Sequence, residues 1–301
     1  MKEIPPGFRR RSISRTNVHA RLVSFLNKEE PKVARWLVRN WKQEADAITY
    51  KEIREALMTG EISLKWLQQW QQDYSRFVTD IMTPTWEKAF VDAGNVIAQD
   101  ISNYAGRSFR YTATGRRVEE FIQKRGGVLA KNLTEQQHAA VKELIRHFVV
   151  DEPVSAQKFA TYLRPVIGLT GKETRAVLNF RDRLLAEGLS SDKIDIQVKK
   201  YAEYLHRARS IRIARTEISY AYNYGEFDAV GKAMDEGYVQ GETLKVWITA
   251  EDERTCPFCS EMDGETIEYN QTFEGLDGEI ECPPLHPNCR CTLGYEVLER
   301  V

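Results

Sequence analysis

All five cysteines of this 301-residue sequence lie between positions 256 and 291, and one histidine lies among them. The first pair has the form Cys256-Pro-Phe-Cys259, and the others belong to the stretch C-P-P-L-H-P-N-C-R-C over 282–291. A C-x-x-C turn places two thiolates on one side of a tight loop, and zinc completes a tetrahedral shell from a second, remote pair of Cys or His. The pattern therefore predicts a zinc centre built from these two stretches.

The predicted zinc ligands are drawn from four thiols and one imidazole: Cys256, Cys259, His286, Cys289 and Cys291. If Cys289-Arg-Cys291 is extended, its two thiols point to opposite faces, so either one serves as the fourth ligand but not both. Cys282 is the least favoured ligand. A shell of four protein ligands is typical of structural zinc, because a catalytic zinc keeps one position open for water.

Other interpretations of the cysteines fit less well. A disulfide framework is disfavoured because the count is odd and the N-terminal stretch M-K-E-I-P-P-G-F lacks the apolar run of a secretory signal. A redox C-x-x-C works at a helix N-terminus in a thioredoxin-like βαβ unit, whereas this one lies between two strand-like segments. Free thiols held by strand packing are the main alternative to structural zinc.

Charge is distributed unevenly along the chain. The formal net charge is −1, yet residues 251–301 carry 13 Asp+Glu against 3 Lys+Arg, which leaves 40 basic and 31 acidic groups in residues 1–250. A basic body with an arginine-rich arm fits contact with a polyanion, and phosphate is the usual one. The candidate contacts in the arm are Arg9, Arg10, Arg11, Arg15 and Arg21. A solvated face with a disordered tail explains the same charges.

Apolar spacing predicts helices over the first 165 residues. Pro31 is expected in the first turn of one helix, and Thr83-Pro84 is expected to start another that ends near Gly106. Helices are predicted at 118–124 and, after a break at Gly126-Gly127, at about 134–149. Five of the six tryptophans lie in residues 36–86, where we expect them to fill the core or helix–helix contacts.

The second half begins with a capping box formed by Thr170 and Glu173, which starts a helix that ends at Gly188. A long helix follows over 192–236. Strand-like segments lie at 244–249, 265–269 and 292–297. The sequence thus predicts a mainly α protein with a small C-terminal α+β module of the zinc-knuckle type. No apolar run approaches the roughly 20 residues of a membrane helix, so no membrane contact is expected.

Several motifs resemble the C-terminal domain of phage head morphogenesis proteins, the minor capsid proteins similar to the F protein of phage Mu. They are A-R-T-E (214–217), A-Y-N-Y-G (221–225), K-V-W-I-T-A-E-D-E-R-T-C-P-F-C (245–259), D-G-E-T (263–266) and P-P-L-H-P-N-C-R-C (283–291). The resemblance divides the chain into a helical, basic N-terminal region over 1–165 and a Mu F-like domain over 166–301, whose Cys/His module spans 244–297. The family's Cys and His positions map onto the five predicted ligands.

The resemblance implies a non-enzymatic minor protein of a tailed-phage virion. Its expected place is the capsid interior or the portal vertex, after assembly in the host cytoplasm. Its expected partners are the portal protein, the major capsid or scaffolding protein and double-stranded DNA, bound without sequence preference through the arginines of the arm. The expected roles are procapsid assembly and DNA packaging or ejection.

Two alternative functions come from other classes. Relatives of the domain are sometimes fused to ADP-ribosyltransferase modules, and Glu251-Asp-Glu253 offers an E-x-E motif to an enzyme delivered with the virion. The partner arginine and the Ser-Thr-Ser strand of that chemistry are absent from the sequence pattern. A zinc-containing DNA-binding regulator would need a basic recognition helix beside the metal, whereas residues 251–301 are strongly acidic.

Overall fold

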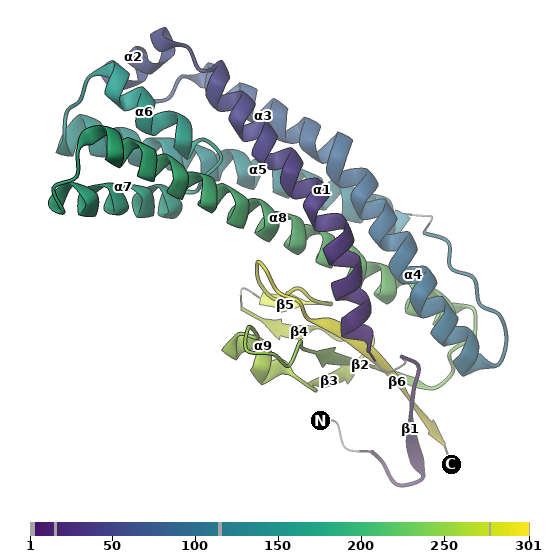
Figure 1. Cartoon of the computed structure of the whole chain (residues 1–301). Coiled ribbons are helices and arrows are strands. Elements are labelled where there is room, and N and C mark those ends of the chain that lie inside the picture. The colour runs from purple at the N-terminus through teal and green to yellow at the C-terminus, as the bar shows by residue number, and fades with distance from the viewer. Residues whose placement is uncertain (1–3, 15–16, 114–115, 277, 301) are drawn as a thin grey trace. The chain divides into compact units, whose positions relative to one another are not determined.

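The computed structural model describes residues 4–14, 17–113, 116–276 and 278–300, and 67% of it is helical. The helices are α1 (Val18–Ala47), α2 (Tyr50–Thr59), α3 (Leu64–Phe77), the π-helical η1 (Val78–Met82), α4 (Thr83–Ala105), α5 (Arg116–Arg146), the π-helical η2 (His147–Asp151), α6 (Ala156–Val166), α7 (Gly171–Ala186), α8 (Ser191–Asp235) and α9 (Pro257–Met262). The strands are β1 (Phe8–Ser12), β2 (Glu242–Ile248), β3 (Thr266–Glu268), β4 (Phe273–Gly275), β5 (Gly278–Ile280) and β6 (Thr292–Arg300). The predicted fold class is confirmed (Figure 1).

The chain forms two compact units, each assembled from separated segments of the sequence. Unit 1 consists of Met1–Pro31, Thr83–Ile122 and Arg212–Val301, and unit 2 consists of Lys32–Met82 and Gln123–Ile211. Helices α1, α5 and α8 therefore contribute residues to both units. This division describes packing, while the predicted boundary at 165/166 describes the extent of a family domain and stays a prediction.

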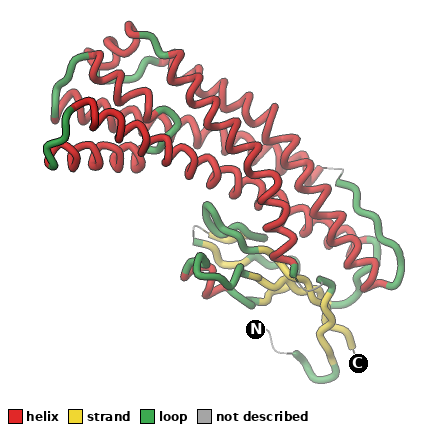
Figure 2. The backbone as a smooth tube through the Cα atoms, viewed as in Figure 1, coloured by secondary structure: helices red, strands yellow, loops and turns green. Residues whose placement is uncertain are grey.

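Unit 1 contains an antiparallel sheet in the order β1-β6-β2-β3, and β4 pairs with β5 in a separate hairpin. The strands are drawn in yellow in Figure 2. The three strands expected at 244–249, 265–269 and 292–297 are β2, β3 and β6. Trp247 of β2 and Tyr295 of β6 are fully buried and pack in one apolar cluster with Ile97 and Ile101 of α4. Four cysteines belong to the same cluster, so the cysteine-rich segments are part of the core of unit 1.

Strand β1 comes from the N-terminal arm, which the sequence presented only as a basic segment. It pairs with the far end of β6, with Phe8 opposite Arg300 and Ser12 opposite Glu296 (Figure 1). Ile13 follows at 3% exposure and joins the core cluster, and its backbone N–H donates to the Tyr295 carbonyl at 2.9 Å. The two ends of the described chain thus meet in one sheet.

Unit 2 is helical, and its core contains large aromatic side chains: Trp41, Tyr74, Phe77, Phe148 and Phe159. The predicted capping box at the start of α7 is confirmed, because the Thr170 side chain accepts from the Glu173 N–H and the Glu173 carboxylate accepts from the Thr170 N–H. A second capping box, Thr49 with Glu52, starts α2.

Two expectations about helix ends were wrong. The pair Gly126-Gly127 does not interrupt α5, and Thr134 lies inside the helix, where its hydroxyl donates to the Ala130 carbonyl. Gln137 of the same helix is fully buried and bonds to side chains of other helices. Pro31 lies inside α1 rather than in its first turn. Tertiary packing outweighs local breaker signals at these positions.

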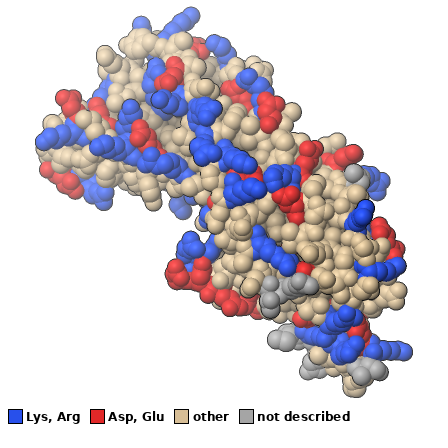
Figure 3. Space-filling view, turned by 45° about the vertical axis from the view of Figure 1, so that its right-hand side comes forward, with Lys and Arg blue, Asp and Glu red and all other residues tan. Residues whose placement is uncertain are grey.

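Acidic and basic side chains are interspersed over the surface, as one face shows (Figure 3). The two units nevertheless differ in charge. Unit 1 has 19 Lys+Arg against 27 Asp+Glu, a net charge of −8, and unit 2 has 24 against 17, a net charge of +7. In the described part of the chain, no helix is both long enough and apolar enough to span a bilayer.

Candidate metal centre

The C-x-x-C stretch forms the first turn of a short helix. Cys256 is the N-cap residue of α9, and Pro257 occupies the first helical position, where its missing N–H costs nothing. The Cys256 Sγ accepts from the Cys259 N–H at 3.4 Å. This capping turn brings both sulfurs to the same side of the loop, which is the arrangement that the spacing predicted.

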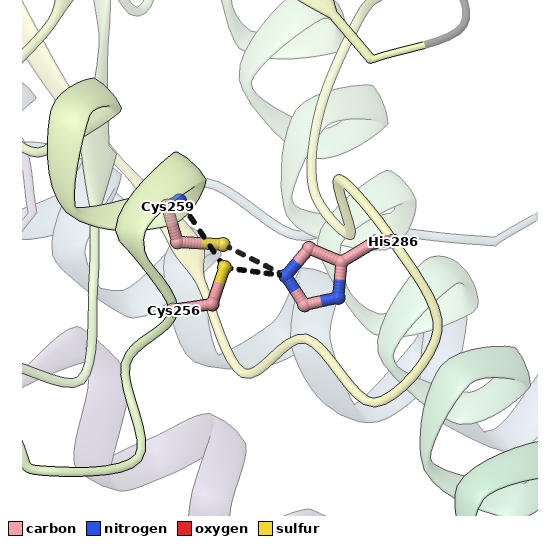
Figure 4. A group of neighbouring side chains, drawn as sticks. All are labelled: Cys256, Cys259 and His286. Atoms are coloured by element: carbon pink, nitrogen blue, oxygen red, sulfur yellow. Dashed lines mark hydrogen bonds between the residues drawn. The ribbon is translucent and has the colours of Figure 1, made fainter.

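The imidazole of His286 lies against both of these sulfurs. His286 Nε2 lies 3.0 Å from Cys256 Sγ and 3.2 Å from Cys259 Sγ (Figure 4). The other ring nitrogen, Nδ1, lies 2.9 Å from the Pro287 carbonyl oxygen. A hydrogen bond from Nδ1 to a carbonyl fixes the tautomer that leaves Nε2 free to bind a metal.

The remaining two thiols, Cys289 and Cys291, complete the cluster from the loop that precedes β6. The Sγ atoms of Cys259 and Cys289 lie 3.7 Å apart, and the ligand atoms of Cys259, Cys289 and Cys291 all lie within 4.8 Å of one another. Two thiolates bound to one zinc at about 2.3 Å in a tetrahedral shell lie about 3.8 Å apart. Together with His286 and Cys256, these residues line a cavity of about 20 Å³.

The thiols of Cys259 and Cys289 are too close together to lose their protons independently of one another. The hydrogen bond between Cys259 and Cys289 lowers the pKa of Cys289 and raises the pKa of Cys259, because one sulfur holds the proton that the other accepts. A metal cation would replace that proton and hold both sulfurs as thiolates. The donor set, its spacing and its cavity are therefore suited to a metal ion, and Cys282 belongs to neither group of close ligands among the described residues.

Sequence reasoning missed the ion pair that joins the two cysteine-bearing segments. Arg290 lies between Cys289 and Cys291, and its Nη1 and Nη2 donate to the two oxygens of Asp252 at 2.7 and 2.5 Å. Asp252 also accepts from the backbone N–H of Arg254, so it holds the loop before Cys256 as well. Hydrogen bonding from Arg290 keeps the pKa of Asp252 well below its ordinary value. The Asp in D-x-R-T and the Arg in C-R-C were visible in the motifs, but not their pairing.

Helix α8 holds the second segment through the A-R-T-E motif. Arg215 Nη1 donates to the Asn288 side-chain oxygen at 2.7 Å, and Thr216 Oγ1 accepts from the Asn288 N–H at 2.9 Å. The carboxylate that faces Arg215 belongs to Glu30, at 2.8 and 3.0 Å. These contacts hold the Cys/His module against the long helix.

The A-Y-N-Y-G motif holds the end of the same segment. Asn223 Nδ2 donates to the Ser219 carbonyl at 2.9 Å and approaches the Cys291 carbonyl at 3.3 Å. Gly225 lies where α8 crosses α4, and a Cβ there would come within 2.8 Å of the Phe90 Cα and carbonyl oxygen. The motif therefore combines a polar contact to the cysteine segment with a close approach between helices.

Four of the five arginines predicted to contact DNA are engaged by carboxylates. Arg9 and Arg11 pair with Glu299 at 3.1 and 3.2 Å, and Arg10 pairs with Glu296 at 3.2 Å. Arg21 pairs with the buried Asp100 at 2.6 Å, and Arg15 lies outside the described residues. The structure places three of these arginines on β1, beside acidic side chains of β6.

Comparison with known proteins supports the resemblance. Residues 177–294 match the family described as Phage Mu protein F like protein. No curated protein and no solved structure matches the chain. The match includes the five clustered Cys and His residues and the segment of α8 that holds them, and it points to phage head morphogenesis. Residues 177–294 of this chain are therefore similar to the phage Mu protein F-like family.

Proposed function

We propose that this protein is a minor head protein of a tailed phage and that a structural zinc ion holds its Mu F-like domain together. The observation that carries the zinc proposal is the convergence of Cys256, Cys259, His286 and Cys289 around one small cavity. Sulfur and imidazole donors in this number favour zinc over the harder Mg²⁺ and Ca²⁺. Cys291 lies close enough to Cys259 to replace Cys289 as the fourth ligand.

The zinc serves structure rather than chemistry in this proposal. Cys259 and Cys289 are 3% and 2% exposed, so the ion would have little access to water or substrate. The strands around it are short, since β3, β4 and β5 have three residues each. A bound ion adds the cross-link that such a thin module lacks, and its binding free energy becomes folding free energy.

A comparison of two cysteine variants tests the zinc proposal. We expect the natural chain, purified anaerobically, to contain one zinc per chain and to lose thermal stability when a strong chelator removes it. Cys259→Ser should abolish zinc binding and lower the melting temperature of unit 1, while unit 2 stays folded. Cys282→Ala is the matched control, because it removes a buried thiol outside the cluster and should retain the zinc. Zinc-free natural protein with an unchanged melting temperature would rule out the proposal.

The family match supports a place for the protein in the virion. We infer association with the portal vertex or the capsid interior, assembly in the host cytoplasm, and contacts with the portal protein and with the major capsid or scaffolding protein. Assistance in procapsid assembly and in DNA packaging or ejection is the function that these contacts would serve. Purification of the protein with its cognate portal tests this inference. Heads assembled without the protein that package and eject DNA normally would contradict it.

Contact with double-stranded DNA is part of the same proposal. Phosphate contacts by Lys and Arg are independent of base sequence and weaken steeply as salt concentration rises. Positive charge on unit 2 supports such contact, while the ion pairs on β1 mean that DNA would compete with Glu296 and Glu299 for the arginines there.

A further inference from the structure

A groove of about 500 Å³ opens on unit 2 between α1, α2 and α3, and three tryptophans line it. Trp66 and Trp70 lie with their ring centroids 5.9 Å apart, and Trp36 stacks on Phe77 at 4.9 Å. Trp66 and Trp70 are 6% and 3% exposed and Trp36 is half-buried, so they present only part of their ring surface to the groove. Trp41, which is 1% exposed, lies outside the lining of the groove. The tryptophan-rich stretch therefore does more than fill the core, because it also forms the wall of this tryptophan groove.

Carboxylates share the lining of the tryptophan groove with the aromatic rings: Glu44, Glu52, Asp73 and Asp80. Two of them already hold cations of the same chain. Lys65 pairs with Glu52 at 3.0 Å, and Arg76 pairs with Asp73. The side chains of Lys65 and Arg76 are 83% and 66% exposed, so they reach these carboxylates from the rim of the groove and are able to move away.

Glu44 lies deeper and has no such partner. It is 8% exposed, and within the described residues no Lys or Arg pairs with it. Its oxygens accept from neutral amides only, Asn40 Nδ2 at 2.6 Å and Gln137 Nε2 at 2.9 Å. Burial, with a smaller contribution from the charge of Asp73, raises the pKa of Glu44 to about 7. A buried carboxylate without a cation is costly to ionise, and each of its oxygens retains a second acceptor position.

We propose that the tryptophan groove binds an arginine or lysine side chain from a basic segment of a partner protein. The aromatic walls attract a cation through their ring faces, and the Glu44 carboxylate supplies the charged acceptor that the cation would pair with. The four carboxylates outnumber the two cations in the lining, although unit 2 as a whole is positive. Charge complementarity therefore selects a basic ligand at this groove. The proposal is independent of the zinc centre, which belongs to unit 1.

A peptide titration tests the proposal on the full-length chain. The probe is a short peptide of alternating arginine and alanine, titrated by calorimetry at pH 8 and low ionic strength, and its control has glutamate in place of arginine. We expect binding of the arginine peptide only. Glu44→Gln should weaken it about tenfold or more, since a hydrogen bond to a charged group contributes about 1.5–3 kcal/mol. Trp66→Phe should weaken it severalfold.

Asp46→Asn is the matched control, because Asp46 is an exposed carboxylate on the same helix that lines a different groove. It should bind the peptide as the natural chain does. Absence of binding by the natural chain would overturn the proposal, as would equal weakening by Asp46→Asn and Glu44→Gln. Circular dichroism shows whether each variant is folded. If Glu44→Gln does not fold, the peptide affinity of Trp66→Phe tests the proposal instead. Zinc content should be the same in all of them.

Discussion

Asp252 and Arg290 join the two segments that carry the clustered cysteines. Their two hydrogen bonds run between the loop before Cys256 and the residue that separates Cys289 from Cys291. Neither side chain belongs to the candidate metal-binding groups, yet both limit how far the two segments can separate. Residues behind metal ligands often change metal affinity by about 10–100-fold when they are replaced.

Replacement of Asp252 by asparagine should therefore loosen the metal centre. Asp252→Asn keeps the size of the side chain but removes the charge that Arg290 pairs with. We therefore expect the zinc affinity of the variant to be about tenfold lower, so that it loses zinc to a competing chelator more readily. A colorimetric chelator assay measures this. Glu253→Gln, on an exposed neighbour in the same loop, is the control and should behave as the natural chain. Equal zinc retention by both variants would show that the ion pair does not support the centre.

Glu44 gives unit 2 a dependence on pH. Its pKa is raised to about 7 in the folded chain, against about 4.5 for an ordinary Glu, because it is buried. The groups around it are Asp73 on α3, Asn40 on its own helix, and Gln137 on α5, which links it to Tyr74. Between pH 4.5 and 7 the folded state holds a proton that the unfolded state releases, so Glu44 makes stability fall as pH rises through this window.

Glu44→Gln should remove that contribution, since glutamine resembles the protonated acid. Relative to the natural chain, the variant should gain at most about 3 kcal/mol of unfolding free energy between pH 5 and pH 8. Urea unfolding at both pH values measures the difference, and Glu55→Gln on the exposed face of α2 is the control. If the unfolding free energies of the two variants change equally between the two pH values, the burial of Glu44 does not cause the pH dependence of stability in this range.

At the scale of elements, the contact between α8 and α4 depends on a residue without a side chain. Gly225→Ala should destabilise unit 1 by about 1–3 kcal/mol, because the added Cβ meets backbone atoms of Phe90 that cannot move aside. Gly127→Ala in α5 is the matched control, since nothing lies within 4 Å of the new Cβ there. In that open helical position alanine should stabilise by about 0.5–1 kcal/mol. Thermal melts that show the same sign for both changes would contradict this account.

The helices were predictable where local signals agreed with packing, and mispredicted where they did not. The helix expected over 192–236 is α8, Ser191–Asp235, and the capping box of Thr170 was visible in the sequence. The Gly126-Gly127 pair suggested a break, but α5 continues because Leu129 and Leu133 on the same helix are buried in unit 2. The spacing of apolar residues predicts a buried helix only weakly when the same stretch also contains residues that favour loops.

The Cys/His cluster was predictable because its members have a distinctive spacing, whereas the contacts that support it are long-range. Asp252 with Arg290, and Arg215 with Glu30 and Asn288, are separated by 38, 185 and 73 residues. No single-sequence pattern joins residues at such separations. Strand β1 was hidden for a similar reason, since F-R-R-R-S lacks the alternation of a strand and becomes one only through pairing with β6.

At the scale of the whole molecule, the separation of charge bears on where DNA would bind. Unit 1 is acidic and unit 2 is basic, and the arginines of β1 in unit 1 already pair with carboxylates. In unit 2, Lys42, Lys199 and Arg207 line one groove between α1, α6 and α8, and among the described residues no carboxylate pairs with any of them. A Lys or Arg that has no carboxylate partner can bind a phosphate without first breaking an ion pair within the protein.

We therefore expect DNA binding to depend on unit 2 more than on β1. Replacing Lys42, Lys199 and Arg207 together by glutamine should weaken binding to duplex DNA of mixed sequence and lower the slope of log affinity against log salt concentration by about 2–3, because each phosphate contact contributes about 0.9. Replacing Arg9, Arg10 and Arg11 in the same way removes the same charge and should change the slope by less than about 1. Filter binding over a range of salt concentrations separates the two results. A larger loss from the β1 variant would place the DNA contact on unit 1 and would mean that phosphates displace Glu296 and Glu299 from their arginines.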